Sequence, residues 1–332
     1  MTIQQAATMQ AVVQDRYGDT GAVLRPAEIA RPEPGPGEVL VRVRAAGVDR
    51  GVWHLMAGKP YAARLAFGLR APKNRVRGTE FAGRVEAVGD GVTAVRAGDE
   101  VYGIGRGSFA EYVLAPEGKV APAPAGVSRV QAAAVPVSAS TALQAVRDHG
   151  RVTAGQRVLV IGASGGVGSF AVQIAKAFGA EVTGVARTDK LDLVRSLGAD
   201  HVVDHTTEDV TGGPARYDVV LDIGGNTPVR RLRKVLTPRG TLVIVGGEGK
   251  GRLLGMGRQL RAAALSPFVG QKLGFFVNRG NAADLVVLTG LIESGQVTPA
   301  VDRTFPLAEA AAAVDYMAAG RPRGKVVVEV SR

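Results

Sequence analysis

The feature that most constrains the fold is an apolar strand that runs directly into a glycine-rich turn and then into an amphipathic helix. Residues 158–161 are all apolar, and the turn after them has the pattern Ala163-x-Gly165-x-x-Gly168. Apolar residues then recur at helical spacing, at Val167, Phe170, Ala171, Ile174, Ala175 and Phe178, and Gly179 stands where a C-terminal cap is expected. A strand, a glycine turn and a helix in this order predict an α/β unit with a parallel sheet.

This turn is also a candidate phosphate-binding loop. Glycines let the backbone approach a pyrophosphate closely, and a helix N-terminus offers free N–H groups at the positive end of its dipole. The turn carries alanine where the dinucleotide fingerprint begins with glycine, and a glycine-rich turn that binds nothing is the alternative. The predicted binding residues of the loop are Ser164, Gly165, Gly166, Val167 and Gly168.

The length and the pattern of the 332 residues predict two domains. Residues 9–125 alternate short strand-like segments with turn signals, which is typical of a small irregular β-barrel. From residue 126 a helical stretch leads to the glycine turn, after which strands and helices alternate up to residue 279 and predict a doubly wound sheet. Because a Rossmann sheet is complete at six strands, residues 280–332 are expected to return to the first domain.

The residue pattern also predicts the bounds of individual strands and helices. Strands are predicted at Phe109–Val113 and Lys272–Val277, and a helix at Leu253–Leu265. The helix belongs to a basic, amphipathic stretch, Gly251–Gln271, which is expected to shape a substrate pocket or a subunit contact.

Composition excludes several kinds of site and partner. The chain has no cysteine, so disulfides and thiolate-ligated metal sites are excluded, which fits a cytoplasmic location. The net charge is +11, but basic residues are spread along the chain without interleaved aromatics, so we expect a solvated surface and no nucleic-acid partner. No window offers the ~20 apolar residues of a membrane span, and the N-terminus lacks a secretory signal pattern, so we expect no membrane partner.

Several sequence motifs together resemble those of the medium-chain dehydrogenase/reductase superfamily over nearly the whole chain. Besides the glycine turn they are residues 36–48, Gly78-Thr-Glu-Phe-Ala-Gly83, residues 85–92, residues 96–101, Leu197-Gly-Ala-Asp200 and residues 324–328, in the family's order and spacing. The resemblance implies a GroES-like catalytic domain at 1–125, completed by 280–332, and a Rossmann domain at 126–279. It also implies an active site in the cleft between them, and a homodimer or homotetramer.

Within the superfamily the chain resembles the zinc-free quinone oxidoreductase and enoyl reductase branch. Zinc-dependent members carry cysteine at the position of Asp49 and histidine at that of Thr79, so no metal is expected here; a substitute set of Asp49, His54 and Glu80 is the alternative. Without a Lewis acid, alcohol oxidation is hard, whereas hydride addition to an enone or quinone remains feasible. The expected activity is reduction of such a small molecule. The alternatives are a carbonyl/alcohol dehydrogenase, or a redox-silent cofactor-binding or cyclising protein.

The expected cofactor is NADPH. NAD-selective sites carry an acid about 20 residues after the glycine turn, to hold the ribose 2′-hydroxyl. Here Arg187 and Lys190 frame that place, and a guanidinium pairs well with a 2′-phosphate; the alternative is that both only cover the next helix. Four further cofactor candidates stand at the ends of later strands, namely Ile223, Gly224, Val245 and Gly246. The resemblance adds His205 on the adenosine side, and Phe275 and Phe276 near the nicotinamide. One of these two phenylalanines is expected to belong to the core.

Two residues are the catalytic candidates. By resemblance, Tyr61 is the first choice as proton donor or substrate anchor, because a tyrosine with a pKa near 10 donates a hydrogen bond at neutral pH. Asp49 stands where related quinone reductases carry asparagine near the nicotinamide ribose, so it is expected to accept from a ribose hydroxyl or from the substrate. Packing of Tyr61, with water as the proton source, is the alternative.

Overall fold

The structure, a computed structural model, describes residues 7–246 and 256–330. It divides into two compact units, which we treat separately. Unit 1 comprises Met1–Val137, Gly280–Gly290 and Val301–Arg332, and unit 2 comprises Ser138–Arg279 and Leu291–Ala300.

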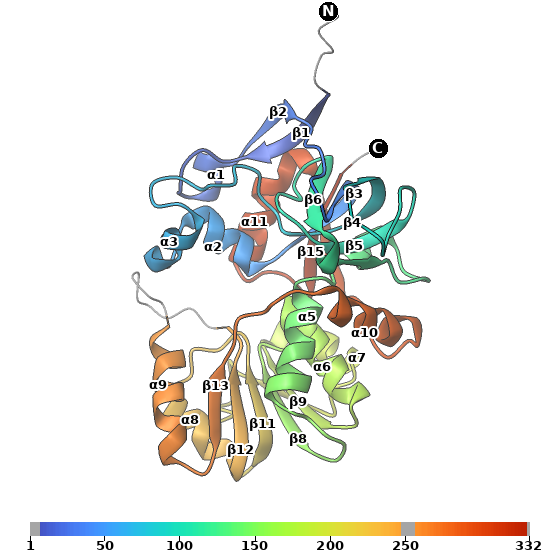
Figure 1. Ribbon diagram of the computed structural model, residues 1–332. Coiled ribbons are helices and arrows are strands. Elements are labelled where there is room, and N and C mark those ends of the chain that lie inside the picture. Colours follow the sequence, from blue (N-terminus) through green and yellow to red (C-terminus); the bar gives the residue numbers. More distant parts are fainter. Residues whose placement is uncertain (1–6, 247–255, 331–332) are drawn as a thin grey trace, which may run out of the picture. The chain divides into compact units, whose positions relative to one another are not determined.

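Unit 2 is built on a six-stranded parallel sheet with the order β10-β9-β8-β11-β12-β13 (Figure 1). The chain starts at β8 in the interior of the sheet, runs outward to β10, and returns to β11 on the other side of β8. This order confirms the predicted doubly wound α/β fold. The strands are β8 (Arg157–Ile161), β9 (Glu181–Ala186), β10 (His201–Asp204), β11 (Tyr217–Asp222), β12 (Leu236–Ile244) and β13 (Lys272–Phe275).

The core of unit 2 lies on both faces of this sheet. Val158, Leu159 and Val160 are consecutive in β8 and all fully buried, as expected for a parallel strand covered on both faces. One core cluster joins the sheet to α8 and α9 through Leu232 and Ala262. The helices of unit 2 are α5 (Ser138–Leu143), α6 (Gly166–Ala177), α7 (Leu191–Ser196), α8 (Val229–Leu232) and α9 (Gly257–Leu265).

The two ends of the main segment of unit 2 are tied to one another. Helix α5 continues directly into a π-helical turn, η3 (Gln144–His149). From this helical segment Thr141 accepts a hydrogen bond from the Asn278 side chain at 2.9 Å, and Gln144 donates to the Arg279 carbonyl at 3.2 Å. The first and last turns of the segment are thereby held within hydrogen-bond distance.

Unit 1 contains a seven-stranded sheet that uses residues from both ends of the chain. Its order is β14-β15-β3-β4-β5-β7, with β6 also paired to β3, and β15 runs antiparallel to β3. Valines and Phe81 from these strands form one apolar cluster with α2 and α11. The strands are β3 (Glu38–Val48), β4 (Glu80–Val88), β5 (Glu100–Ile104), β6 (Tyr112–Pro116), β7 (Val120–Pro122), β14 (Val301–Pro306) and β15 (Lys325–Glu329).

The rest of unit 1 consists of a hairpin and short helices. Strands β1 (Thr8–Val13) and β2 (Arg25–Ala30) form a separate two-stranded antiparallel sheet. Helix α4 begins at a capping box in which Ser128 and Gln131 satisfy each other's backbone N–H groups. The helices are α1 (Thr20–Val23), α2 (Arg50–Ala57), α3 (Arg64–Phe67), α4 (Arg129–Ala133), α10 (Ala282–Glu293, which extends into unit 2) and α11 (Ala310–Ala318).

Three predicted bounds differ from the structure. Strand β6 begins at Tyr112 and not at Phe109, because the Phe109 carbonyl accepts from Val12 and its ring is fully buried. Strand β13 ends at Phe275, where its pairing with Ile244 of β12 ends. Helix α9 begins at Gly257, and residues 251–255 of the basic stretch lie outside the described part of the chain. Over the described residues, the helices lack the combination of length and hydropathy that a bilayer crossing requires.

Candidate functional site

The glycine turn of unit 2 is organised by Gly162, one position before the predicted start of the motif. Gly162 has a φ of 86°, and its N–H and that of Ala163 both donate to the Val185 carbonyl, at 3.1 and 3.0 Å. A Cβ at Gly162 would lie 2.8 Å from the Gly224 nitrogen. The fingerprint has Ala163 at the position of its first glycine, and in the structure the preceding residue, Gly162, makes the tight turn.

The helix that follows presents uncapped N–H groups. Gly165 is the N-cap of α6, and no side chain caps this helix within the described chain. A Cβ at Gly168 would overlap the Gly162 carbonyl oxygen, so only glycine lets α6 start this close to the turn. Free N–H groups at the start of a twelve-residue helix, next to a glycine turn, fit a phosphate group.

The loop after β11 lies against this turn. Gly246 approaches the Ile223 carbonyl so closely that a Cβ there would overlap it, and the Val245 N–H donates to the Asp222 carbonyl at 3.0 Å. The structure therefore brings Ile223, Gly224 and Gly246 together beside Gly162. All of them follow the carboxyl ends of parallel strands, where open α/β sheets bind ligands.

A buried ion pair that the sequence analysis missed holds this loop. The carboxylate of Asp222 is fully buried and accepts the Gly225 N–H at 3.1 Å, and the Arg258 guanidinium binds both this carboxylate and the Gly225 carbonyl. Burial lowers the pKa of Arg258. An acid at the end of an apolar strand was the available signal, but no pattern linked it to Arg258 on α9.

The end of β9 carries the predicted 2′-phosphate residues. Arg187 is exposed, and its Nε lies 3.5 Å from a carboxylate oxygen of Asp189. Lys190 is buried, with 6% of its surface exposed. His205 is exposed, and its backbone N–H donates to the Ala186 carbonyl at 3.1 Å. The neighbouring carboxylate, Asp204, accepts the hydroxyls of Thr188 and Thr206, and these hydrogen bonds lower its pKa.

The two phenylalanines after β12 face different surroundings. Phe275, the last residue of β13, packs against the apolar cluster that contains Leu242. Phe276 stacks on the ring of His149, with centroids 4.2 Å apart and an angle of 14° between the planes.

In unit 1, Asp49 is the N-cap of α2. One of its carboxylate oxygens accepts the Val52 N–H at 3.1 Å and the other accepts the Thr79 hydroxyl at 2.9 Å. His54, a member of the alternative zinc set, has its Nδ1 2.9 Å from the Lys59 carbonyl oxygen. Within the described residues no group of three or more His, Cys, Asp and Glu side chains is placed to hold a metal.

Behind Asp49 lies a second buried ion pair that the sequence analysis missed. Glu80 and Lys325 bind each other in the interior, with side chains 0% and 1% exposed. Glu80 also accepts the Val137 N–H at 2.8 Å, and Lys325 donates to the Val48 carbonyl at 3.2 Å. Burial and, to a smaller extent, the charge of Asp49 raise the pKa of Glu80 to about 7, against the opposing effect of Lys325.

Tyr61 lies on the surface of unit 1, in the short helical turn η1 (Tyr61–Ala63). Its side chain is 40% exposed, and the Arg64 guanidinium lies 4.7 Å from its ring centroid and 4.4 Å from that of Tyr17. Arg64 is held in place by donating to the Gly58 carbonyl at 2.9 Å. Tyr61 thus has an accessible ring beside a fixed cation.

Comparisons with known families agree with this architecture. The family described as "Alcohol dehydrogenase GroES-like domain" matches residues 35–125, and the family described as "Zinc-binding dehydrogenase" matches residues 197–328. The NADPH-dependent alkenal/one oxidoreductase of Arabidopsis thaliana chloroplasts is 34% identical over 339 residues, which cover 96% of this chain and 79% of the relative.

Solved structures show the same similarity. The quinone oxidoreductase of Coxiella burnetii superposes with a TM-score of 0.86 at 27% identity, covering 98% of this chain and 100% of the other. The mycobacterial protein Rv1454c, solved in complex with NADPH, superposes with a TM-score of 0.81 at 28% identity, covering 97% and 99%. Together with the doubly wound sheet and the glycine turn, these matches show that the chain belongs to the medium-chain dehydrogenase/reductase superfamily of oxidoreductases, in its zinc-free quinone oxidoreductase branch.

Proposed function

We propose that the protein is an NADPH-dependent, zinc-independent reductase of quinones or α,β-unsaturated carbonyls. The observation that carries the proposal is the end of β9, where Arg187 directly follows the strand and no acid stands before Asp189. A single exposed ion pair such as that of Arg187 with Asp189 contributes little, so the guanidinium remains available to a 2′-phosphate. The names of the Arabidopsis relative and of the mycobacterial structure support the same cofactor.

The residues of unit 2 divide the work of holding the dinucleotide. The free N–H groups at the start of α6 would hold the pyrophosphate, and Gly162, Gly168 and Gly224 would let it approach the backbone. Arg187, with Lys190 and His205, would hold the adenosine end. When bound, the nicotinamide supplies a hydride. The pair of Asp222 and Arg258 keeps the loop of Ile223 and Gly224 in position.

Unit 1 would supply the polar groups for the substrate. Tyr61 is accessible and is our candidate to donate a hydrogen bond or proton to the carbonyl that gains negative charge, with Arg64 beside it favouring that charge. Asp49 already accepts two donors, and each carboxylate oxygen retains a lone pair for a ribose or substrate hydroxyl. The GroES-like domain, 1–125 with 280–332, is our proposed catalytic domain, and we propose a homodimer or homotetramer in the cytoplasm.

Cofactor preference is tested by measuring the dissociation constants of NADPH and NADH for the wild type, Arg187→Asp and Arg195→Asp. Arg195 is an exposed arginine of α7, so it controls for the general change of charge. Loss of a charge-assisted pair should weaken NADPH binding by roughly 10- to 100-fold in Arg187→Asp and leave NADH nearly unchanged. An unchanged preference in Arg187→Asp would remove Arg187 from this role.

Substrate class is tested by following NADPH oxidation in the presence of quinones, enals and ketones. Turnover with quinones or enals supports the proposal. Turnover with ketones alone would identify a carbonyl reductase, and binding of NADPH without oxidation in any reaction would identify a redox-silent protein.

A further inference from the structure

A cavity of about 570 Å³ lies in unit 2, away from the glycine turn. Its walls come from the amino ends of the strands: Gln156 precedes β8, Asp218 is near the start of β11, and Lys272 is the first residue of β13. The glycine turn follows the carboxyl end of β8, so the cavity opens at the opposite edge of the same sheet. Its volume is within the range of small-molecule sites, roughly 300–1,000 Å³.

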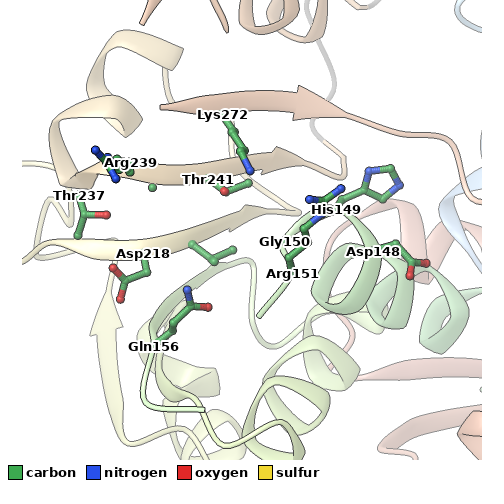
Figure 2. A pocket seen from close by; sticks show the side chains of 12 residues that line it. Asp148, His149, Gly150, Arg151, Gln156, Asp218, Thr237, Arg239, Thr241 and Lys272 are labelled. Carbon is green, nitrogen blue, oxygen red and sulfur yellow. The ribbon is translucent and has the colours of Figure 1, made fainter. Parts of the chain in front are cut away.

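Cationic side chains without partners gather around this cavity. Figure 2 shows Arg239 and Lys272 on β12 and β13, with Arg151 following the π-helical turn at the other side. Within the described part of the chain, the side chains of these three residues make no ion pair and no hydrogen bond. All three residues are exposed and line one cavity, and like charges gathered without counter-ions repel one another, so a bound anion would be stabilised among them.

The acidic residues of the wall do not supply that anion. Asp148 is bound in a two-pronged pair by the neighbouring Arg147, at 2.6 and 2.8 Å, and this pairing lowers its pKa. Asp218 accepts only the backbone N–H of Arg157, at 3.0 Å, among the described residues. The wall therefore holds three unpaired cations against one carboxylate that has no basic side-chain partner.

The neutral groups of the wall are also mainly donors. The Gln156 side-chain oxygen already accepts the Thr153 N–H at 3.0 Å, which leaves its amide NH₂ available. The hydroxyls of Thr237 and Thr241 line the same cavity and can donate. His149 is fixed at the rim by its stacking on Phe276.

The geometry points to a second ligand site, a receptor for a small anion that carries several phosphate or carboxylate groups, bound by Arg151, Arg239 and Lys272 at the amino edge of the unit 2 sheet. An anion of this kind would reach cations that come from three separate segments, which a single chloride or acetate would not. This site is independent of the proposed reductase activity and of its cofactor.

Isothermal titration calorimetry with sodium tripolyphosphate and with citrate tests this site. The variants are the double substitution Arg239→Gln/Lys272→Gln and, as a matched control, Arg230→Gln, an exposed arginine on α8 outside the cavity wall. We expect saturable binding of one anion by the wild type and by Arg230→Gln. The double variant should bind at least about tenfold more weakly, because each lost charge-assisted contact costs about that factor.

Two further arms locate the binding and identify its chemistry. Arg187→Asp should bind the anion as the wild type does, which separates the cavity from the proposed 2′-phosphate position. Preference for tripolyphosphate would identify phosphate groups as the recognised chemistry, and preference for citrate would identify carboxylates. Failure of both anions to bind, equal binding by the double variant, or an equal loss in Arg230→Gln would overturn the inference. Cooperative thermal unfolding of the ligand-free double variant, at or above the wild-type temperature, checks that it folds.

Discussion

Replacing Lys325 by methionine removes the cation that faces Glu80 in the interior of unit 1, and the resulting loss of stability should grow with pH. In the wild type, burial raises the folded-state pKa of Glu80 from 4.5 to about 7 even though Lys325 opposes the shift. Without Lys325 the pKa must rise further. A carboxyl whose folded pKa is raised is protonated in the folded state and ionised in the unfolded state between the two values, so folding stability falls as pH increases across that window.

The two proteins therefore differ most above neutral pH. Wild-type stability should fall between pH 4.5 and about 7 and then level off, whereas the variant continues to lose about 1.4 kcal/mol per pH unit until its own higher pKa is reached. An ionised carboxylate left without its buried partner costs about 3–5 kcal/mol, which sets the scale of the difference near pH 8.5. Near pH 5.5 both proteins keep Glu80 neutral, and the difference should shrink to about 1 kcal/mol or less.

The assay is urea unfolding followed by tryptophan fluorescence. The chain has a single tryptophan, Trp53, which packs against the apolar cluster of unit 1 and so reports on the unit that contains the pair. Lys325→Met/Glu80→Gln is the control, since it lacks the titrating group and should show no comparable increase of the loss with pH. A loss of stability in Lys325→Met that is independent of pH, or larger at low pH, would refute the reasoning.

Two more substitutions test the roles proposed for the glycine turn and for Tyr61. Gly168→Ala should lower the stability of unit 2 by about 1–3 kcal/mol and weaken dinucleotide binding, because the added Cβ overlaps the Gly162 carbonyl. Gly274→Ala, where a Cβ meets nothing within 4 Å, is the matched control. Equal shifts of the thermal unfolding temperature for the two variants would count against this explanation. Tyr61→Phe should reduce turnover of an enone by about 100-fold or more if its hydroxyl donates the proton, without lowering stability. In contrast, Tyr17→Phe should cost about 1 kcal/mol of stability and leave turnover intact, because its hydroxyl donates to the Gly68 carbonyl at 2.6 Å; full activity of Tyr61→Phe would end its catalytic assignment.

The fold could be predicted because its signals are local. The apolar residues of β8, the glycine turn and the stripe of α6 lie within about 20 consecutive residues, and their periods distinguish strand from helix. The same local pattern does not show which residue makes the tight turn, because spacing does not report φ; only the backbone shows that Gly162 has a positive φ. A short-range pattern therefore gives the element and misses the conformation of a single residue.

The ion pairs escaped prediction because their partners are far apart in sequence. Glu80 and Lys325 are separated by 245 residues, and Asp222 and Arg258 by 36. In each pair the two partners lie too far apart in sequence to belong to one helix or strand, so the pair forms only when two elements pack together. The cavity at the amino edge of the sheet has the same origin, since its cations come from segments that no motif connects.

The ties between the two ends of unit 2 bear on the order in which the chain folds. Strand β15 must pair with β3 across about 280 residues, since Val326 faces Val48 and Glu329 faces Ala45, and closing so long a loop of unfolded chain is slow. Unit 2 can build its sheet from Ser138–Arg279, and once it has done so the hydrogen bonds of Thr141 with Asn278 and of Gln144 with Arg279 bring the flanking segments together. Folding of unit 2 thus shortens the loop that this pairing must close, and we expect the inserted unit to speed the assembly of the unit around it.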